Sequence, residues 1–317
     1  MLRKKNISEL MQLLIVSCFA TLLTFLISAW LGAPFSLWFD DIAYVILVGV
    51  GFVFFMALVW DSVLILCMQQ RWRFFPQGAL SLVLIGLTIY TIGCTSNVVL
   101  ISLKLLGPAT QWHDAILWNL EGDWIRLISF WLLPVRKWDL IYFCFWFIEL
   151  ASAFFLIVFG RSKAIFQNFC LSLILVYYIG RYLAVVYPVM GPAFEHPEYF
   201  SYLHGTTSQS AMAQLTEIMS LSPDLALQRG GAMLGGISAM PSLHVAMAFL
   251  TTSWLAKVSR WSLVFTIPWF ILNWLSTIVL GWHYILDGVA GVVLGILVMG
   301  ITWFIHRYGC LSTSCKI

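Results

Sequence analysis

Residues 42–66 read IAYVILVGVGFVFFMALVWDSVLIL, a stretch in which Asp61 is the only charged side chain. A transmembrane helix needs about 20 predominantly apolar residues, so this stretch predicts a helix that crosses a membrane. Seven further segments have the same character, at residues 10–31, 79–103, 138–160, 164–189, 241–256, 262–281 and 286–305. The sequence therefore predicts an all-α polytopic membrane protein with about eight transmembrane helices.

The composition excludes several other classes of protein. Hydrophobic residues make up 61% of the chain and charged residues only 10%, whereas a soluble globular domain carries about 25% charged residues. A formal net charge of +3 is too small to suggest a nucleic-acid partner. The seven cysteines lie mostly in apolar runs without CxxC spacing, so we interpret them as small packing residues rather than metal ligands.

The basic residues predict the orientation in the membrane, because cytoplasmic loops carry an excess of Lys and Arg. With a cytoplasmic N-terminus, eleven of the 17 basic residues fall in cytoplasmic segments, and the opposite segments are mostly acidic. The cytoplasmic set is Arg3, Lys4, Lys5, Arg71, Arg73, Arg161, Lys163, Lys257, Arg260, Arg307 and Lys316. We therefore expect both termini in the cytoplasm. The short loops and the absence of sorting signals favour a bacterial inner membrane as the location. A Golgi-type membrane with a lumenal site is the alternative.

Two long connecting segments lie on the predicted outer side. Residues 104–137 place an apolar residue at every fourth position, at Trp112, Ile116, Leu120 and Trp124. This pattern predicts an amphipathic helix in the membrane interface. The predicted organisation is a three-helix region 1–106, an interfacial segment 107–137, a transmembrane core 138–306 with an extracytoplasmic loop 190–240, and a cytoplasmic tail 307–317.

The first candidate motif is Met240-Pro241-Ser242-Leu243-His244. It predicts the outer start of a helix, because proline is tolerated in a first helical turn. The free N–H groups and the positive dipole end of such a helix attract an anion. Ser242 adds a hydroxyl donor there, and His244 adds an ionisable group. The alternative is a plain loop–helix junction with Ser242 as its cap.

The second candidate motif contains His283 and Asp287, which are four residues apart and share one face on a continuous helix. A carboxylate there accepts the Nδ1 proton and leaves Nε2 free, as in a nucleophilic or general-base histidine. A zinc site at His244 and His283 lacks a third ligand with suitable spacing. Gly291 and Gly295 form a small-xxx-small pair, which predicts a close approach between helices.

Arg181 is the third candidate, inside the fifth span and about 12 Å along a helix from its outer end. A permanently charged guanidinium at that depth needs an anionic partner. One alternative is a structural ion pair with Glu149 in the fourth span. The other is a bound phosphate group.

These motifs resemble those of the type-2 phosphatidic acid phosphatase superfamily, over roughly residues 110–305. Its Pro-Ser-Gly-His motif corresponds to Pro241-Ser242-Leu243-His244, and its Ser-Arg-x5-His-x3-Asp motif to Ser276-Thr277-x5-His283-x3-Asp287. Leu243 and Thr277 replace the glycine and the arginine, and both departures resemble the branch of inositol phosphorylceramide synthases and their bacterial relatives. The Lys-x6-Arg-Pro motif is not present as such, and Arg181-x6-Pro188 is its nearest match.

The resemblance implies a phosphatase or phosphotransferase without metal or cofactor. Its partners would be membrane lipids, with a lipid phosphate or phospholipid as substrate and water or an alcohol as acceptor. In the family's chemistry His283 attacks phosphorus, Asp287 orients it, and His244 gives a proton to the leaving oxygen and later takes one from the acceptor. The resemblance assigns the phosphate oxygens to Arg181 and Ser242.

The outer loop 190–240 is the predicted place for recognition of the lipid head group, with plain loop structure as the alternative. Its candidate residues are His196, His204 and Arg229. Two other classes of function stay open at this point. One is a lipid or ion transporter with a path lined by Arg181 and Glu149, and the other is a non-catalytic membrane subunit. The sequence predicts no oligomeric state.

Overall fold

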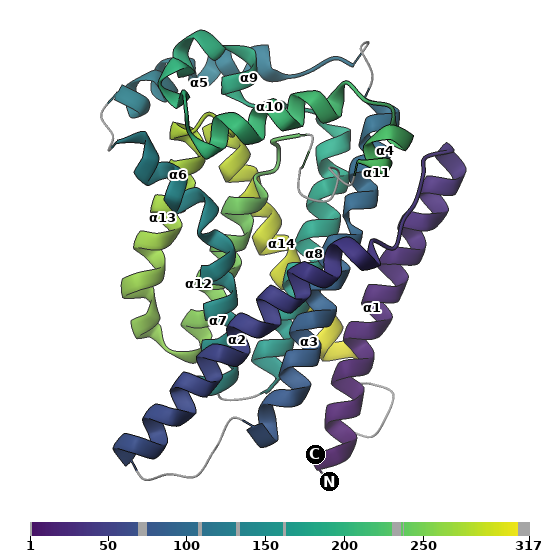
Figure 1. The fold of residues 1–317 in the computed structure, drawn as a ribbon, viewed down its shortest axis with the longest axis vertical. Helices are drawn as coiled ribbons and strands as arrows, with labels where there is room; N and C mark the ends of the chain where they lie inside the picture. The colour runs from purple at the N-terminus through teal and green to yellow at the C-terminus, as the bar shows by residue number, and fades with distance from the viewer. Residues whose placement is uncertain are drawn as a thin grey trace.

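The computed structural model describes residues 2–68, 75–106, 110–130, 134–160, 163–229, 236 and 238–309. Every regular element in these ranges is helical, which confirms the predicted fold class (Figure 1). The predicted tail beyond residue 309 lies outside the described residues. The helices of the bundle are α1 (Leu2–Leu31), α2 (Phe39–Met68), α3 (Phe75–Cys94), α4 (Ser96–Leu105), α6 (Val135–Phe143), α7 (Phe145–Phe159), α8 (Lys163–Val186), α12 (Leu243–Val258), α13 (Leu263–Val279) and α14 (Ile285–Gly309).

Each of the eight predicted segments coincides with one helix or one broken helix pair. Six helices of the described ranges are long and apolar enough to cross a membrane, and α6 with α7, bent by 43°, makes a seventh if the pair forms one span. α12 is apolar but has only 16 residues, fewer than the number of about 20 that crosses a bilayer. The membrane-spanning fold is therefore confirmed, whereas the count of eight spans remains a prediction.

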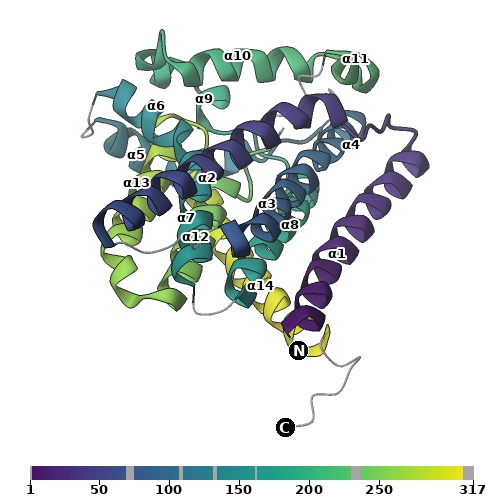
Figure 2. The ribbon, with the colours of Figure 1, turned by 60° about the horizontal axis from the view of Figure 1, so that its bottom comes forward.

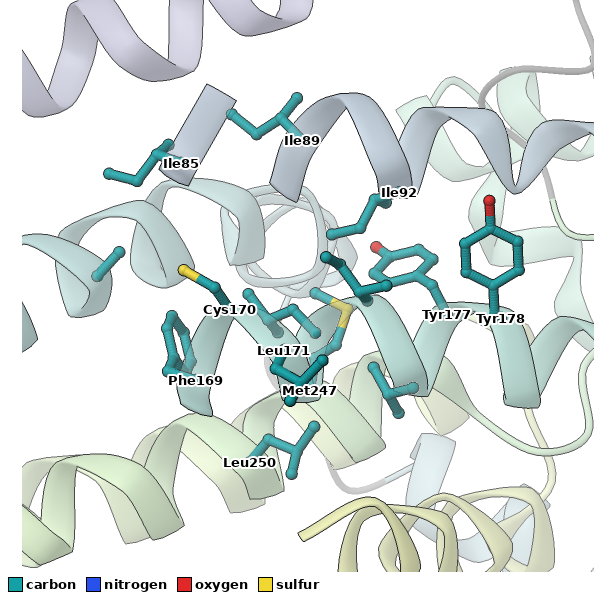
Figure 3. Packing of buried hydrophobic residues seen from close by; sticks show 14 of the residues in the cluster. Ile85, Ile89, Ile92, Phe169, Cys170, Leu171, Tyr177, Tyr178, Met247 and Leu250 are labelled. Atoms are coloured by element: carbon teal, nitrogen blue, oxygen red, sulfur yellow. The ribbon is translucent and has the colours of Figure 1, made fainter. Parts of the chain in front are cut away.

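α8 lies at the centre of the bundle. Of its most apolar 18-residue stretch, 61% is buried, against 17% for α1. Figure 3 shows α8 between α3 and α12, with Ile89 and Ile92 on one side and Met247 on the other. Because packing on both sides holds α8, it also fixes the depth of Arg181, which this helix carries.

The two long connecting segments lie together at one end of the bundle, which we call the cap end (Figure 1, Figure 2). They contain α5 (Asp114–Phe130), α9 (Pro192–Glu195), a 3-10 helix (Pro197–Leu203), α10 (Thr207–Met219) and α11 (Pro223–Gln228). α1 begins and α14 ends near the opposite end (Figure 2). The ends of the last spans that lie at the cap end therefore meet under these shorter helices (Figure 1).

α5 has one exposed apolar face and one buried face. The exposed side chains are Ile116, Leu120 and Trp124, each 57% to 64% accessible. The buried face consists of Asp114, Leu117, Glu121 and Ile125, and it packs against α13 and α14. The helix expected within residues 104–137 is present, and its location in the membrane interface remains a prediction. Its buried face brings two carboxylates to the bundle.

Two glycines allow α14 to approach α12 closely, as their spacing predicts. A Cβ at Gly291 would clash with the carbonyl oxygen of Ser242. A Cβ at Gly295 would lie 2.6 Å from Cδ1 of Phe249. This contact sets the distance between the N-terminus of α12 and the first turns of α14, where the two histidine motifs lie.

Candidate active site

The N-terminus of α12 carries the first motif at the cap end. The Ser242 hydroxyl oxygen accepts a hydrogen bond from the N–H of Val245 (3.4 Å), and the Ser242 N–H donates to the carbonyl oxygen of Asp287 (2.9 Å). The helix begins at Leu243 with Ser242 as its cap, so Pro241 precedes the helix and does not open it as predicted. Because the Ser242 oxygen acts as an acceptor, its hydroxyl hydrogen stays free to donate.

A tight turn between α13 and α14 carries the second motif. Gly281 has a φ of +71°, a backbone conformation that favours glycine. The N–H groups of Trp282 and His283 both donate to the carbonyl oxygen of Thr277, at 3.0 and 3.1 Å. Thr277 is fully buried, and its hydroxyl donates a hydrogen bond to the carbonyl oxygen of Trp274. At the position of the family's motif arginine, this chain therefore has a residue that supports the turn.

His283 and Asp287 are paired, although not along one helix. α14 begins at Ile285, so His283 lies in the preceding turn and the prediction of a continuous helix is wrong. Nδ1 of His283 lies 3.5 Å from Oδ2 of Asp287, and the same carboxylate oxygen accepts a hydrogen bond from the N–H of Tyr284 (2.8 Å). The fully buried carboxylate stands on the Nδ1 side of the ring, so it favours a tautomer with Nε2 unprotonated.

His244 faces His283 across a short gap. The centroids of the two imidazole rings are 6.2 Å apart. Tyr142 stacks on the His244 ring at 4.2 Å and Phe145 contacts its edge at 4.4 Å, so the break between α6 and α7 holds this imidazole. Nε2 of His244 has no hydrogen-bond partner among the described residues. A small group bound between the two rings can contact both.

Arg181 of α8 is the third polar group of the site. Its Nε and Nη1 atoms are buried without a hydrogen-bond partner in the described part of the chain, and the guanidinium lies 5.9 Å from the ring centre of Tyr177. Glu149 instead accepts a hydrogen bond from Thr251, and the described side chains of Glu149 and Arg181 form no salt bridge. A buried cation in this state attracts an anionic ligand.

A cavity of about 520 Å³ joins these groups. Arg181, His244 and His283 line it, whereas Ser242 and Asp287 are fully buried beside them. The rest of the lining is mainly apolar and comes from α2, α3, α6, α7, α8, α10 and α12, and from the segments that connect the helices at the cap end. This volume is typical of a site for a drug-sized ligand. Among the described residues, no group of three or more His, Cys, Asp or Glu side chains is placed to hold a metal ion.

Two carboxylates of α5 hold the backbone on either side of the site. Glu121 accepts hydrogen bonds from the N–H groups of residues 285–286, at 2.5 and 2.9 Å, where α14 begins. Asp114 accepts hydrogen bonds from the N–H groups of residues 190–191, at 2.9 and 2.8 Å. Burial raises the pKa of both carboxyl groups, and the backbone hydrogen bonds oppose that rise. The ionised form of each carboxyl group is thus the one that these bonds stabilise.

A third carboxylate ties α10 to the turn that carries His283. Asp139 accepts hydrogen bonds from the N–H groups of residues 207–208, at 2.8 and 3.0 Å, and from the Ser208 hydroxyl at 2.6 Å. The Ser208 hydroxyl oxygen accepts a hydrogen bond from Nε1 of Trp282 (3.2 Å). The N-terminus of α10 is therefore fixed beside the residue that precedes His283.

The three loop residues proposed for head-group recognition lie away from these groups. Nδ1 of His196 lies 3.0 Å from Oε1 of Glu198. Arg229 forms a salt bridge with Glu217, and His204 is exposed. None of the three lines the cavity, so their role in head-group recognition remains a prediction.

α10 supplies a part of the cavity wall that the motifs do not indicate. Its contribution consists of Ala211, Gln214, Leu215 and Ile218. This spacing is that of one helix face, and it is the signal by which the wall could be predicted within the loop. Tyr142, which stacks on His244, gives no comparable signal because the chain is rich in aromatic residues throughout.

A family model described as the PAP2 superfamily matches residues 120–301. The matched span contains Arg181, His244, His283 and Asp287, and it excludes α1 to α4. Comparisons with curated proteins and with solved structures gave no match. Because the matched span is more than half of the 317 residues, the chain belongs to the PAP2 superfamily of helical membrane proteins.

Proposed function

We propose that the protein is a membrane-embedded lipid phosphatase or phosphotransferase that acts on a lipid phosphate or phosphodiester through a phosphohistidine at His283. Membership of the PAP2 superfamily suggests a membrane phosphatase-type activity. The proposal of a phosphohistidine at His283 depends on one observation. A single cavity is lined by Arg181, His244 and His283, and Asp287 lies beside Nδ1 of His283.

In the first half-reaction, Nε2 of His283 attacks phosphorus. A P–N bond forms, and the P–O bond to the leaving group breaks. His244 enters this step as an imidazolium and gives its proton to the leaving oxygen. Asp287 holds the proton on Nδ1 and stabilises the positive charge that develops on the His283 ring.

In the second half-reaction, neutral His244 takes a proton from an acceptor hydroxyl while the acceptor oxygen attacks phosphorus and the P–N bond breaks. Water as acceptor makes the enzyme a phosphatase, and an alcohol makes it a phosphotransferase. Leu243 and Thr277 support a place in the branch that resembles inositol phosphorylceramide synthases. That placement in turn supports transfer to an alcohol beside hydrolysis.

The phosphate oxygens are proposed to contact donors from two helices. Arg181 of α8 supplies a buried guanidinium with two unpartnered nitrogen atoms. α12 supplies the free N–H groups and the positive end of its first turn, and the free hydroxyl hydrogen of Ser242 stands at the same helix end. Donors arranged in this way stabilise the charge that develops on the phosphoryl oxygens in the transition state.

The alternative of a lipid or ion transporter has less support in the geometry. Its path requires both Arg181 and Glu149. Arg181 lines the cavity, but Glu149 does not, and it accepts a hydrogen bond from Thr251 within the helix bundle. The two intramembrane charges therefore do not line one common cavity in the described part of the chain.

We place the cap end outside the cytoplasm, so that the active site is periplasmic in a bacterial inner membrane. Both α1 and α14 have their terminal ends opposite the cap end (Figure 2). Lys163 begins α8, Lys257 lies in the last turn of α12, and Arg307 lies in the last turn of α14. Basic residues at the end opposite the cap fit a cytoplasmic location of that end.

The proposal is tested with purified protein in detergent and a panel of lipid phosphates and phospholipids, with and without alcohols. Phosphate release and new phospholipid products are followed together, and His283→Ala is the inactive control. Free phosphate that is lost in the variant identifies a phosphatase. A new phosphodiester lipid without phosphate release identifies a phosphotransferase. Equal products from wild type and His283→Ala across the panel would contradict the proposal.

Glu121→Gln is expected to lower kcat by about tenfold to a hundredfold. A glutamine has one acceptor oxygen for the two N–H groups of residues 285–286, so one of them loses its partner. An unpaired buried donor costs about 1–3 kcal/mol, and about 1.4 kcal/mol corresponds to a factor of ten in rate. The affected turn adjoins His283 and Asp287, so kcat should fall more than KM changes.

Asp123→Asn is the matched control on the same helix. Asp123 has a 92% exposed side chain that pairs with Arg126, so its substitution should leave both kcat and the melting temperature unchanged. If Glu121→Gln lowers the melting temperature while kcat stays at the wild-type value, Glu121 stabilises the fold and does not position the catalytic turn.

A further inference from the structure

The cavity extends well beyond its polar groups, and one part of its wall comes from α2 and α3. These helices contribute Ile42, Val45, Ile89, Ile92 and Gly93 to the lining. Both helices lie outside residues 120–301, the span that matches the family model. This wall is therefore a feature of the N-terminal region of this chain.

Three helices indicate that the cavity runs from the polar groups toward the middle of the bundle. On α8, which rises toward the cap end, Tyr177 lies one turn deeper than Arg181, and both line the cavity (Figure 1). On α12, which descends from the cap end, Met247 lies about one turn, or about 5 Å, below the N-terminus. On α3, Ile89 lies one turn deeper than Ile92, and both line the cavity, Ile92 pointing toward α8 (Figure 3) and Ile89 packing against Gly49 of α2.

The wall formed by α2 and α3 is closely packed. A Cβ at Gly93 would lie 2.5 Å from Cδ1 of Ile42, and a Cβ at Gly49 would lie 2.7 Å from Cδ1 of Ile89. Both isoleucines are buried. A β-branched side chain held against a neighbouring backbone has few alternative rotamers. Ile42 and Ile89 therefore give this part of the cavity a defined width.

We propose that this apolar arm binds a hydrocarbon chain of the substrate lipid, and that α2 and α3 thereby set which chains the enzyme accepts. The proposal rests on the proposed function, because it places the phosphate group against Arg181, between the two catalytic histidines. A chain attached to that phosphate enters the arm beside Tyr177 and passes between Ile89 and Met247. All three of these side chains line the same cavity.

The arm selects chains by shape rather than by hydrophobicity. Lipid tails are as apolar as the side chains that line the arm, so transfer of a chain from the bilayer gains little from the hydrophobic effect. Close packing against a wall of fixed width does discriminate between chains of different size. Overfilling a well-packed site costs about 1–3 kcal/mol. A chain too long or too bulky for the arm is therefore a poor substrate.

Ile89→Phe is expected to lower kcat/KM for long-chain substrates relative to short-chain ones by about tenfold. The substrates share one phosphorylated head group and differ only in chain length. Val83→Phe is the matched control, since Val83 lies on the outer face of α3, is 57% exposed and does not line the cavity. It should leave the ratio unchanged, and Ile89→Ala should shift the preference toward longer or bulkier chains.

A second measurement detects the chain without turnover. A long-chain lipid phosphate with a diazirine near the end of its chain is photolysed with His283→Asn protein, and labelled peptides are mapped. Labelling of the α3 segment that contains Ile89 and Ile92 should fall when unlabelled lipid phosphate competes. It should be lost in the double variant that carries Ile89→Phe together with His283→Asn. Labelling there that neither competitor nor substitution reduces would overturn the proposal.

The two measurements separate this proposal from the proposed function. If no substrate shows turnover that depends on His283, the proposed function fails, and the labelling still decides whether a chain occupies the arm. If turnover depends on His283 but Ile89→Phe and Val83→Phe have the same chain preference as wild type, the chain-binding role of α2 and α3 is wrong. The enzymatic function stands in that case.

Discussion

His283→Asn is expected to abolish phosphoenzyme formation and to lower kcat by more than about 10³-fold. The amide of asparagine cannot replace the imidazole nitrogen that attacks phosphorus. Among the described residues no second histidine is paired with Asp287, since His244 packs against Tyr142 and Phe145 on the other side of the gap. Rapid quenching with radiolabelled substrate, followed by detection of acid-labile phosphoprotein, measures this directly.

His244→Asn is expected to give a different result that depends on the leaving group. With an alkyl phosphate, loss of the proton donor should slow the first half-reaction by about 10²–10⁴-fold. With nitrophenyl phosphate, the leaving group needs no proton, so the first half-reaction should stay fast. The second half-reaction still needs a base for water, so phosphoenzyme should accumulate in this variant.

His306→Asn is the matched control for both histidine substitutions. His306 lies in the last turn of α14, at the end opposite the cap, and it does not line the cavity. Its substitution should leave both phosphoenzyme formation and steady-state kcat unchanged. Wild-type levels of phosphoenzyme in His283→Asn would show that another residue is the nucleophile. If both variants lost the first half-reaction with nitrophenyl phosphate to the same extent, the assignment of His283 as nucleophile and His244 as proton donor would be contradicted.

The sequence allowed the prediction that Arg181, His244 and His283 lie close together, because a membrane limits where the residues of each span can lie. Spans that cross a bilayer place residues near their outer ends at a similar depth, and the basic residues indicate which ends are outer. Sequence position within a span therefore translates into spatial position far better than it does in a soluble protein. The pairing of His283 with Asp287 was predicted from the four-residue spacing on a continuous helix. In the structure the two side chains meet because His283 lies in the turn before Ile285, where α14 begins.

The contacts of Glu121 and the wall formed by α2 and α3 could not be predicted in this way. In an amphipathic helix a carboxylate is normally assigned to the polar face, but Glu121 lies on the buried face because it accepts hydrogen bonds from the N–H groups of residues 285–286. Ile89 lines a cavity and Val83 is exposed on the outer face of the same helix. Both are apolar, because lipid tails and an apolar cavity favour the same side chains.

Gly291→Ala is expected to lower both activity and stability. The added Cβ would clash with the carbonyl oxygen of Ser242 and lie 3.2 Å from the nitrogen of Ala246. The N-terminus of α12 must then move away from α14, which also strains the hydrogen bond from the Ser242 N–H to Asp287. Overpacking of this kind costs about 1–3 kcal/mol, and a displacement of about 1 Å between catalytic groups can cost about a hundredfold in rate.

Gly300→Ala tests the same substitution farther along α14. Apart from the chain neighbours and the backbone of α14 itself, no heavy atom of the described residues lies within 4 Å of a Cβ at Gly300. Alanine favours a helix over glycine by about 0.5–1 kcal/mol. Its melting temperature, followed by tryptophan fluorescence in detergent, should therefore equal or slightly exceed that of wild type, with kcat unchanged. If Gly291→Ala behaved like Gly300→Ala in both measurements, the close contact of α12 with α14 would not set the histidine spacing. The spacing would then depend on the rings of Tyr142 and Phe145 that hold His244.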